Sequence, residues 1–268
     1  MAAVMELEVS PASVTMGAQV GGVDLAGGIS ADQFTQLHEL LLEHHLLVLP
    51  GQDLSAVELE EFGRLWGELL IHPAAGRHRD TDYVQRLAGK NAMFRFFPGT
   101  HPFGGGWHSD MTWHPTPPAI TALHAQRMPA AGGNTIFANQ HVAYETLDEA
   151  TQAQLDGLTA FHSGKIFGPD VPDSVHPVVR THDDSGKKAL FVNPNFTKHI
   201  EGMDENESLL LLYRLMAHAA RPEFTYRHEW DAGDLVLWDN RSVMHYAITD
   251  YVEKRVMHRI TIQGGKPV

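Results

Sequence analysis

The chain has 268 residues, 43% of them hydrophobic, which is enough to bury a large core within one domain. Its 20 Lys and Arg against 33 Asp and Glu give a net charge of −13, which disfavours binding to nucleic acid. Because cysteine is absent, disulfides, thiolate zinc sites and cysteine-held clusters are excluded, and any metal must be bound by nitrogen and oxygen atoms.

The first residues lack the basic-then-apolar pattern of an export signal, and no apolar run approaches the roughly 20 residues of a membrane helix. We therefore expect a soluble cytoplasmic protein that does not interact with membranes. No internal repeat or long linker interrupts the sequence, so residues 1–268 are expected to form a single domain.

Two helices and a strand are predicted in the N-terminal quarter of the chain. Residues 29–45 predict the first helix, because Ser30 and Gln33 form a capping-box pattern ahead of apolar residues at helical spacing. The apolar run of residues 46–49 predicts a short strand. A second helix is expected to begin at Ser55, where the capping pattern recurs.

Residues 73–106 are polar, rich in glycine and histidine, and show no clear helical or strand period. We interpret this segment as one long loop. Loops of such length inside compact domains are usually functional, so residues 73–106 are expected to act as an active-site lid.

Short apolar runs predominate from residue 119 onward. Strands are expected at residues 119–125, 134–138, 189–192, 235–238 and 255–263, and helices at residues 140–147, 150–157 and 204–219. Helices before and between many short strands predict an α+β domain around a β-sandwich or barrel.

The His-x-Asp motif at His108 and Asp110 is the first candidate for chemistry. If this segment is a strand, residues two apart project from the same face, so an imidazole and a carboxylate would point together. They would supply two arms of a facial triad of two histidines and one carboxylate, which holds Fe(II) and leaves three positions open. The tripeptide alone is weak evidence, because it occurs by chance in many proteins.

A third arm must come from a distant histidine, and His245 is the candidate. It follows the apolar strand at residues 235–238 and a turn at Asp239 and Asn240, so it is expected at the end of a hairpin. Without further signals, a hydrogen-bonded core histidine would be the better interpretation of this residue.

The last predicted strand carries Arg255 and Arg259 on one face of a strictly alternating pattern. On a solvated face they would be ordinary surface charges. Facing a barrel interior, each would need an anion, because an unpaired buried charge is costly. Two anion sites would suit a dicarboxylate co-substrate and a second, acidic substrate, since the guanidinium fork matches carboxylate and sulfonate.

Together with other ordered motifs, these residues resemble the taurine/2,4-dichlorophenoxyacetate dioxygenase family of Fe(II)- and 2-oxoglutarate-dependent oxygenases. The likeness runs over nearly the whole chain. Its motifs are Gly17-Ala18-Gln19-Val20, Gly22-Val23-Asp24-Leu25, Phe62-Gly63, Gly67-Glu68, Trp107-His108-Ser109-Asp110-Met111-Thr112, Pro117-Pro118, Gly132-Gly133-Asn134-Thr135, Ala189-Leu190-Phe191-Val192-Asn193, Trp238-Asp239-Asn240, and His245-Tyr246 through Arg255 and Arg259.

The resemblance implies a double-stranded β-helix (jelly-roll) core with flanking helices. By this resemblance, His108, Asp110 and His245 would bind Fe(II). Arg255 and the Thr135 hydroxyl would hold the distal carboxylate of 2-oxoglutarate, whose keto-acid end chelates the metal.

The same resemblance suggests residues for the substrate. Arg259 is left for the anionic group of the substrate or for the near carboxylate of 2-oxoglutarate. His72 matches a position that helps bind the sulfonate in taurine-oxidising members, with an ordinary loop histidine as the alternative. Gly104 and Ala75 stand where those members carry an asparagine and a tyrosine, so taurine is not expected and a roomier pocket is. Three further side chains are candidates for the pocket lining: Met111, Phe161 and Phe191. For the two phenylalanines, packing in the core is the alternative.

The implied reaction consumes O₂ and 2-oxoglutarate, releases succinate and CO₂, and hydroxylates a small acidic substrate, with cleavage or desaturation as further outcomes. Sulfonates, sulfate esters, aryloxy acids and amino-acid-like metabolites fit this description. Members of this size often associate, so a homo-oligomer is expected. Two alternatives stay open, namely a cupin-type metal-dependent isomerase or lyase and a non-catalytic acid-binding barrel.

Overall fold

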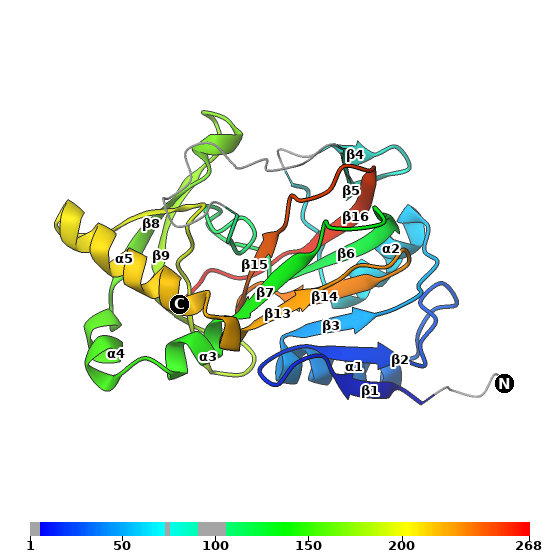
Figure 1. Ribbon diagram of the computed structural model, residues 1–268, viewed down its shortest axis with the longest axis horizontal. Coiled ribbons are helices and arrows are strands. Elements are labelled where there is room, and N and C mark those ends of the chain that lie inside the picture. The colour runs from blue at the N-terminus through cyan, green and yellow to red at the C-terminus, as the bar shows by residue number, and fades with distance from the viewer. Residues whose placement is uncertain (1–5, 73–75, 91–105) are drawn as a thin grey trace.

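The computed structural model describes residues 6–72, 76–90 and 106–268, and its largest element is an eight-stranded sheet (Figure 1). From edge to edge the strands are β1 (Glu8–Pro11), β2 (Ala18–Gly21), β3 (Leu46–Leu49), β14 (Leu235–Asp239), β6 (Ile120–Arg127), β16 (Arg255–Ile262), β5 (Thr81–Gly89) and β4 (Arg77–His78). Neighbours are antiparallel except β2 and β3, which are parallel. In the middle of this sheet, β14 and β16 from the C-terminal part of the chain lie between strands from the N-terminal half.

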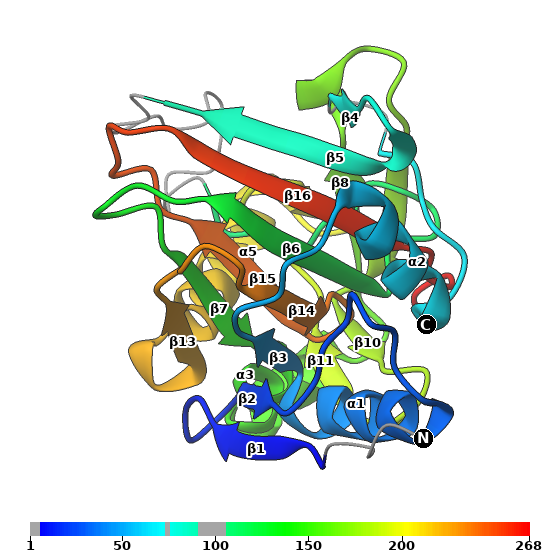
Figure 2. The same ribbon diagram turned by 90° about the vertical axis from the view of Figure 1, so that its right-hand side faces the viewer.

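Two helices, α1 (Ala31–His44) and α2 (Ala56–Trp66), pack on one face of this sheet (Figure 2). Both begin as predicted, because Ser30 and Ser55 each form a complete capping box with the residue three positions later. Their apolar sides, including Leu41 and Phe62, are buried against the sheet. The sequence-local capping signal therefore fixes where these helices start.

The opposite face of the large sheet packs against a three-stranded sheet of β13 (Thr225–His228), β7 (Thr135–Asn139) and β15 (Val243–Ala247). Side chains alternate along a strand. In β3, Leu47 and Leu49 face the helices, whereas Leu46 and Val48 join the core shared with Phe137 of the smaller sheet. Both faces of β3 are thus buried, which explains its uninterrupted apolar sequence.

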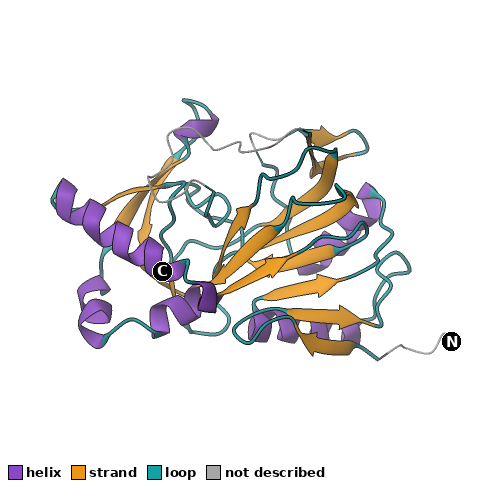
Figure 3. Ribbon diagram, in the orientation of Figure 1, coloured by secondary structure: helices purple, strands orange, loops and turns teal. Residues whose placement is uncertain are grey.

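The remaining elements form a third region, with helices gathered on the side away from α1 and α2 (Figure 3). They are α3 (Gln140–Glu145), α4 (Glu149–Leu155) and α5 (Glu205–Ala219), the sheet of β12 (Thr197–Ile200), β8 (Thr159–Ser163) and β9 (Asp173–Pro177), the pair β10 (Val179–Thr181) and β11 (Lys188–Leu190), and the 3-10 turns η1 (Lys165–Phe167) and η2 (Pro222–Phe224). Helices α3, α4 and α5 confirm the three helices predicted at residues 140–147, 150–157 and 204–219. None of the helices in the described ranges is both long and apolar enough to cross a bilayer.

The loop predicted at residues 73–106 is wrong in part, because its middle is strand β5, whose residues 85–89 pair with β16. Val84 and Gln85 are buried, whereas Asp82 and Arg86 are exposed. The polar residues of this near-edge strand concealed its period in the sequence. Of the rest of the predicted lid, the structure describes residues 76–80, which include β4, together with residues 90 and 106. Ala75 and Gly104 lie outside the described residues.

The hairpin predicted to end at His245 is also wrong. β14 lies between β3 and β6 in the large sheet, whereas β15 pairs with β7 in the smaller sheet. Residues 240–242 therefore carry the chain from one sheet to the other. A strand–turn–strand pattern in the sequence does not specify whether its two strands pair.

Asp239 is the centre of a buried ion network at this crossing. Its carboxylate accepts hydrogen bonds from Arg241 Nε at 2.9 Å and Nη2 at 2.7 Å, and His182 Nε2 lies 2.8 Å from it. Burial alone would raise the pKa of Asp239, but His182 and Arg241 outweigh burial and hold that pKa well below its ordinary range.

Asp239→Asn is expected to lower the free energy of unfolding by about 3 kcal/mol at pH 7, because only the partly exposed carboxylates of Asp183 and Asp184 would then face the Arg241 charge. Because the pKa of Asp239 is depressed in the folded state, the wild type is more stable than the variant above pH 3.8, the ordinary pKa of this carboxyl. This difference in stability is lost progressively as the pH falls below 3.8 toward the depressed folded-state pKa. Urea unfolding of both proteins at pH 7 and at acid pH measures this difference. Equal stabilities at pH 7 would contradict the network's role.

Candidate active site

His108 and His245 face each other across a short stretch of antiparallel backbone. The His108 N–H donates to the His245 carbonyl at 2.9 Å, and the His245 N–H donates to the His108 carbonyl at 2.7 Å. His245 belongs to β15, but His108 makes only this isolated bridge, so the strand expected around His-x-Asp is not formed. The chain turns instead, and the turn continues into Met111 at φ 50°.

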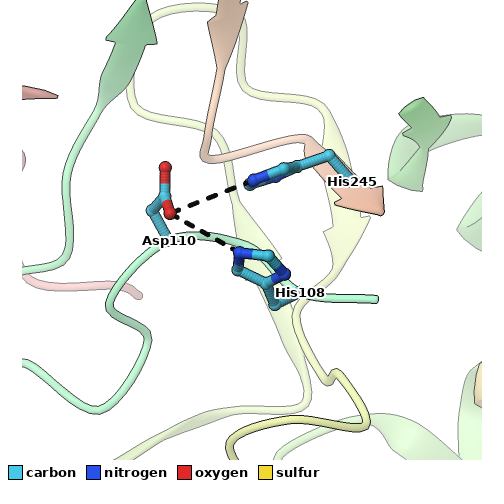
Figure 4. A group of neighbouring side chains, drawn as sticks. All are labelled: His108, Asp110 and His245. Atoms are coloured by element: carbon cyan, nitrogen blue, oxygen red, sulfur yellow. Dashed lines mark ion pairs between the residues drawn. The ribbon is translucent and has the colours of Figure 1, made fainter. Parts of the chain in front are cut away.

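Asp110 completes a cluster with the two histidines, and all three side chains point toward one another (Figure 4). Its Oδ1 lies 3.7 Å from His108 Nε2 and 4.0 Å from His245 Nε2. Of the residues that the structure describes, only these form a group of three or more possible metal ligands, with ligand atoms within 4.8 Å of one another. The separations are too long for hydrogen bonds and leave room for an ion between the three atoms.

The protonation states suit metal binding. His108 Nδ1 lies 2.7 Å from the Gly106 carbonyl, which can only accept, so Nδ1 carries the proton and Nε2 presents a lone pair. Burial lowers the pKa of His245 to about 3 and also lowers the pKa of His108, so both rings are neutral at pH 7. Burial would raise the pKa of Asp110, but Arg259 and the two histidines outweigh it, so this carboxyl is ionised.

Arg259 lies beside this cluster on β16. Its Nη1 donates to Asp110 Oδ1 at 3.2 Å, and its Nε donates to Gln85 Oε1 at 2.6 Å. The other carboxylate oxygen of Asp110 accepts from the Thr121 hydroxyl at 2.8 Å. Gln85 and Thr121 carry no signal in the sequence, because each lies on a strand whose partners only the tertiary structure reveals.

A cavity of about 230 Å³ opens beside the triad. The described residues that line it are His72, Leu87, His108, Asp110, Met111, Ile166, Phe167, Asn195, Phe196 and Arg259. Three of the five predicted substrate residues are thus present: His72, Met111 and Arg259. Burial, and secondarily the Arg259 charge, lower the pKa of His72 to about 4, so this ring is neutral at pH 7.

Phe161 and Phe191, by contrast, do not line the cavity. Phe161 stacks on His199 with ring centroids 5.1 Å apart. Phe191 is buried beneath the Arg180 guanidinium, whose carbon lies 4.9 Å from the Phe191 ring centroid. The core alternative is therefore correct for Phe191, and the aromatic lining comes from Phe167 and Phe196 instead. These two lie in a 3-10 turn and a loop, where no sequence period indicates direction.

Arg255 on β16 and Thr135 on β7 mark a second polar position, where both contact Trp230. The Arg255 Nε is buried without a hydrogen-bond partner among the described residues, and its guanidinium carbon lies 5.9 Å from the Trp230 ring centroid. Burial lowers the pKa of this side chain. The Thr135 hydroxyl oxygen accepts from Trp230 Nε1 at 3.0 Å, which leaves the hydroxyl proton for another acceptor. A partly buried cation and a hydroxyl donor gathered around one tryptophan ring offer a binding position for an anion.

The arrangement as a whole fits a metal centre with two anion positions. Two neutral imidazoles and one carboxylate, without thiolate, are the ligand set that non-haem Fe(II) oxygenases use, and such a triad leaves coordination positions for further ligands. Arg259 offers one charge at the cavity wall, and Arg255 offers a second that forms no ion pair with a described residue. The site can therefore hold a metal, a chelating acid and a further small anion.

Comparison with known proteins is consistent with this geometry. Residues 8–261 match the model of the family described as taurine catabolism dioxygenase TauD, TfdA family. An alpha-ketoglutarate-dependent sulfate ester dioxygenase from Pseudomonas putida is 32% identical over 98% of this chain and 92% of its own length. An (S)-phenoxypropionate/alpha-ketoglutarate-dioxygenase from Sphingobium herbicidovorans is 33% identical over 96% of this chain and 95% of its own length.

Solved structures show the same likeness in three dimensions. The crystal structure of a taurine dioxygenase from Burkholderia xenovorans superposes with a TM-score of 0.87 at 34% identity, and the match covers 98% of this chain and 91% of that one. The similarity therefore extends over the large sheet, the smaller sheet and the helices alike.

Proposed function

Because this chain belongs to the taurine catabolism dioxygenase TauD, TfdA family, we propose that its cavity binds a small organic anion and presents one of its C–H bonds for oxidation. The chain is an enzyme, a 2-oxoglutarate-dependent dioxygenase that uses Fe(II) and O₂. Bound Fe(II) supplies the activation of O₂ that couples decarboxylation of 2-oxoglutarate to oxidation of the substrate.

The metal would be held by His108, Asp110 and His245. The two imidazoles present lone pairs without first losing a proton, because their pKa values are lowered. The Gly106 carbonyl fixes the tautomer of His108, and Thr121 together with Arg259 fixes the orientation of the carboxylate. These contacts orient the ligands of the metal before it binds.

We assign the distal carboxylate of 2-oxoglutarate to Arg255 and Thr135. The buried guanidinium lacks an anion in the described part of the chain, and the threonine hydroxyl, held by Trp230, has a proton to donate. A dicarboxylic acid would thus neutralise Arg255 at one end while its keto-acid end reaches the metal. Its binding removes the cost of a desolvated, unpaired charge.

The observation that carries the substrate assignment is the Arg259 cation at the wall of a cavity whose other described lining residues, apart from the triad, are mostly apolar. Arg259 would bind the anionic group, with neutral His72 nearby, while Phe167, Phe196 and Leu87 contact an alkyl or aryl group. The cavity volume of about 230 Å³ suits a small molecule. Alkyl sulfate esters, sulfonates and aryloxy acids combine these two features, and taurine, whose tail is a charged amine, does not.

Oxidation next to a heteroatom would lead to cleavage. A hydroxyl group placed on the carbon that bears a sulfate or aryl ether oxygen gives a product that collapses to a carbonyl compound, releasing sulfate or a phenol. The cation at Arg259 orients such a substrate, because it holds the anionic end and so determines which carbon lies nearest the triad. No observation in the described ranges favours the isomerase, lyase or non-catalytic alternatives.

We also propose that the large sheet and the smaller sheet together form a double-stranded β-helix (jelly-roll) core and that residues 1–268 are one dioxygenase domain. The two sheets bury a common apolar cluster, and the three triad residues come from segments that lie where these sheets meet. In this proposal the metal centre would lie inside the core, not on its surface.

A substrate panel tests the proposal. Fe(II)-dependent succinate release should be stimulated by short alkyl sulfates or aryloxy acids at least about 10-fold more than by taurine, since an apolar lining of this kind discriminates a charged tail by more than 1.4 kcal/mol. Uncharged alcohols with the same tails serve as matched controls, because they lack the group for Arg259. Equal stimulation by acid and alcohol, or a preference for taurine, would contradict the assignment.

A further inference from the structure

Asp110 lies on irregular backbone. The neighbouring His108 makes an isolated bridge, and the chain turns from Asp110 through Met111, so no strand ladder holds the main chain at Asp110. A side chain that binds a metal must be held to within about 0.5 Å of its working position. Some other contact must therefore fix this turn.

The side chain of Asn240 makes that contact. Its Oδ1 accepts from the Asp110 N–H at 2.6 Å, and its Nδ2 donates to the Asp110 carbonyl at 3.0 Å. These are the two bonds that an opposite residue of an antiparallel strand would make, formed here by one amide side chain. The same Nδ2 donates to the Pro118 carbonyl at 3.1 Å, so both of its protons are used.

Asn240 is itself firmly held. Its side chain is fully buried, and its own N–H donates to the Ala119 carbonyl at 2.8 Å. It occupies the crossing between β14 and β15, next to the Asp239–Arg241 ion network. The amide is thus anchored at the junction of the two sheets, and it extends that anchoring to the Asp110 main chain, which makes no backbone–backbone hydrogen bond with a described residue.

The contacts of the Asp110 carboxylate do not serve the same purpose. Arg259 and Thr121 bind its two oxygen atoms and so orient the end of the side chain. They do not bind the main chain, whose position determines where the side chain begins. Removing the Asn240 amide would leave a buried N–H and a buried carbonyl of Asp110 unpaired, which favours a shift of this turn.

We propose that Asn240 is a positioning residue of the metal centre, which sets the Asp110 carboxylate through the Asp110 backbone. The inference rests on the proposed function, namely that Asp110 binds Fe(II). Asn240 bonds to neither His108 nor His245, so its effect is confined to one of the three ligands. Its loss should therefore weaken metal binding without removing any ligand.

The test is Mn(II) binding to the full-length protein, followed by the electron paramagnetic resonance signal of free Mn(II). Asn240→Ala is expected to weaken binding about 10–100-fold, the usual effect of losing a group that orients a metal ligand. Asn139→Ala is the matched control. Asn139 is also a buried asparagine with several backbone contacts, but it caps α3. Its loss should lower the melting temperature and leave Mn(II) affinity unchanged.

The outcomes separate the inference from the proposed function. If wild type fails to bind Mn(II), or if Asp110→Ala binds it equally well, the metal centre itself is wrong. If Asp110→Ala loses binding while Asn240→Ala binds like wild type, only the positioning role is wrong. Equal weakening by Asn139→Ala would also overturn that role, because it would show general destabilisation.

A milder variant keeps the test decisive if Asn240→Ala does not fold. The hydroxyl of Asn240→Ser can reach one Asp110 group at most, so weaker Mn(II) binding is again expected, at a smaller cost in melting temperature. Wild-type affinity in a folded Asn240→Ser protein would overturn the proposal.

Discussion

Replacing Asp110 with alanine is expected to abolish Fe(II)-dependent release of succinate from 2-oxoglutarate. The substitution removes the anionic ligand and leaves Arg259, which donates to that carboxylate at 3.2 Å, as an uncompensated charge beside the metal position. Loss of a group that only orients a ligand costs about 10–100-fold in metal affinity or activity, so loss of the ligand itself should cost more than about 100-fold. Anaerobic metal titration and a succinate assay measure both quantities.

Asp204→Ala is the matched control for this substitution. The Asp204 carboxylate caps α5 by accepting from the backbone of Asn206 and Glu207, so its loss should cost about 1 kcal/mol of stability and leave turnover intact. His108→Ala should behave like Asp110→Ala. Survival of 2-oxoglutarate turnover in both triad variants would show that these residues do not bind the metal.

Arg255→Ala is expected to raise the 2-oxoglutarate concentration needed for half-maximal rate by on the order of 100-fold. A charge-assisted hydrogen bond contributes about 1.5–3 kcal/mol, and a guanidinium can make two of them to one carboxylate. The KM for the primary substrate should change little, because Arg255 lies four residues along β16 from Arg259, about 13 Å away. Steady-state kinetics with each substrate varied in turn separates the two effects.

Arg259→Ala provides the reciprocal measurement. It should raise the KM for the anionic substrate more than the KM for 2-oxoglutarate, because Arg259 lines the cavity and Arg255 does not. Arg259→Ala also removes a partner of Asp110, so metal affinity must be measured in the same variant. Equal effects of both arginine variants on both KM values would mean that the division of the two anions is incorrect.

The elements that local chemistry determines were predictable from the sequence. Ser30 and Ser55 begin helices because capping depends on residues three positions apart, and the alternation of β16 is visible in its own eight residues. Strand β5 was missed because its exposed charges hide the buried Val84 between them. The separation of β14 from β15 was missed because pairing is a property of the whole fold and leaves no mark on either strand.

The candidate site shows the same division. The resemblance indicated His108, Asp110 and His245, and the structure brings all three together, though by a bridge and a turn and not along one strand. Asn240 was interpreted as a turn residue, which is true of its backbone but says nothing of its side-chain amide. Phe167 and Phe196 could not be anticipated, because the direction of a side chain in irregular structure depends on neighbours distant in the sequence.

The paired backbone of His108 and His245 has a consequence for how this protein can change. Their spacing is set by two main-chain hydrogen bonds, which every residue type except proline can make, whereas Ile166 and Phe167 contact the cavity from a 3-10 turn outside every sheet. Substitutions in that turn can alter which molecule is accepted without disturbing the geometry that activates oxygen. Reactivity and selectivity are thus encoded in separate stretches of the chain, and a new preference can arise by mutation while the old chemistry persists.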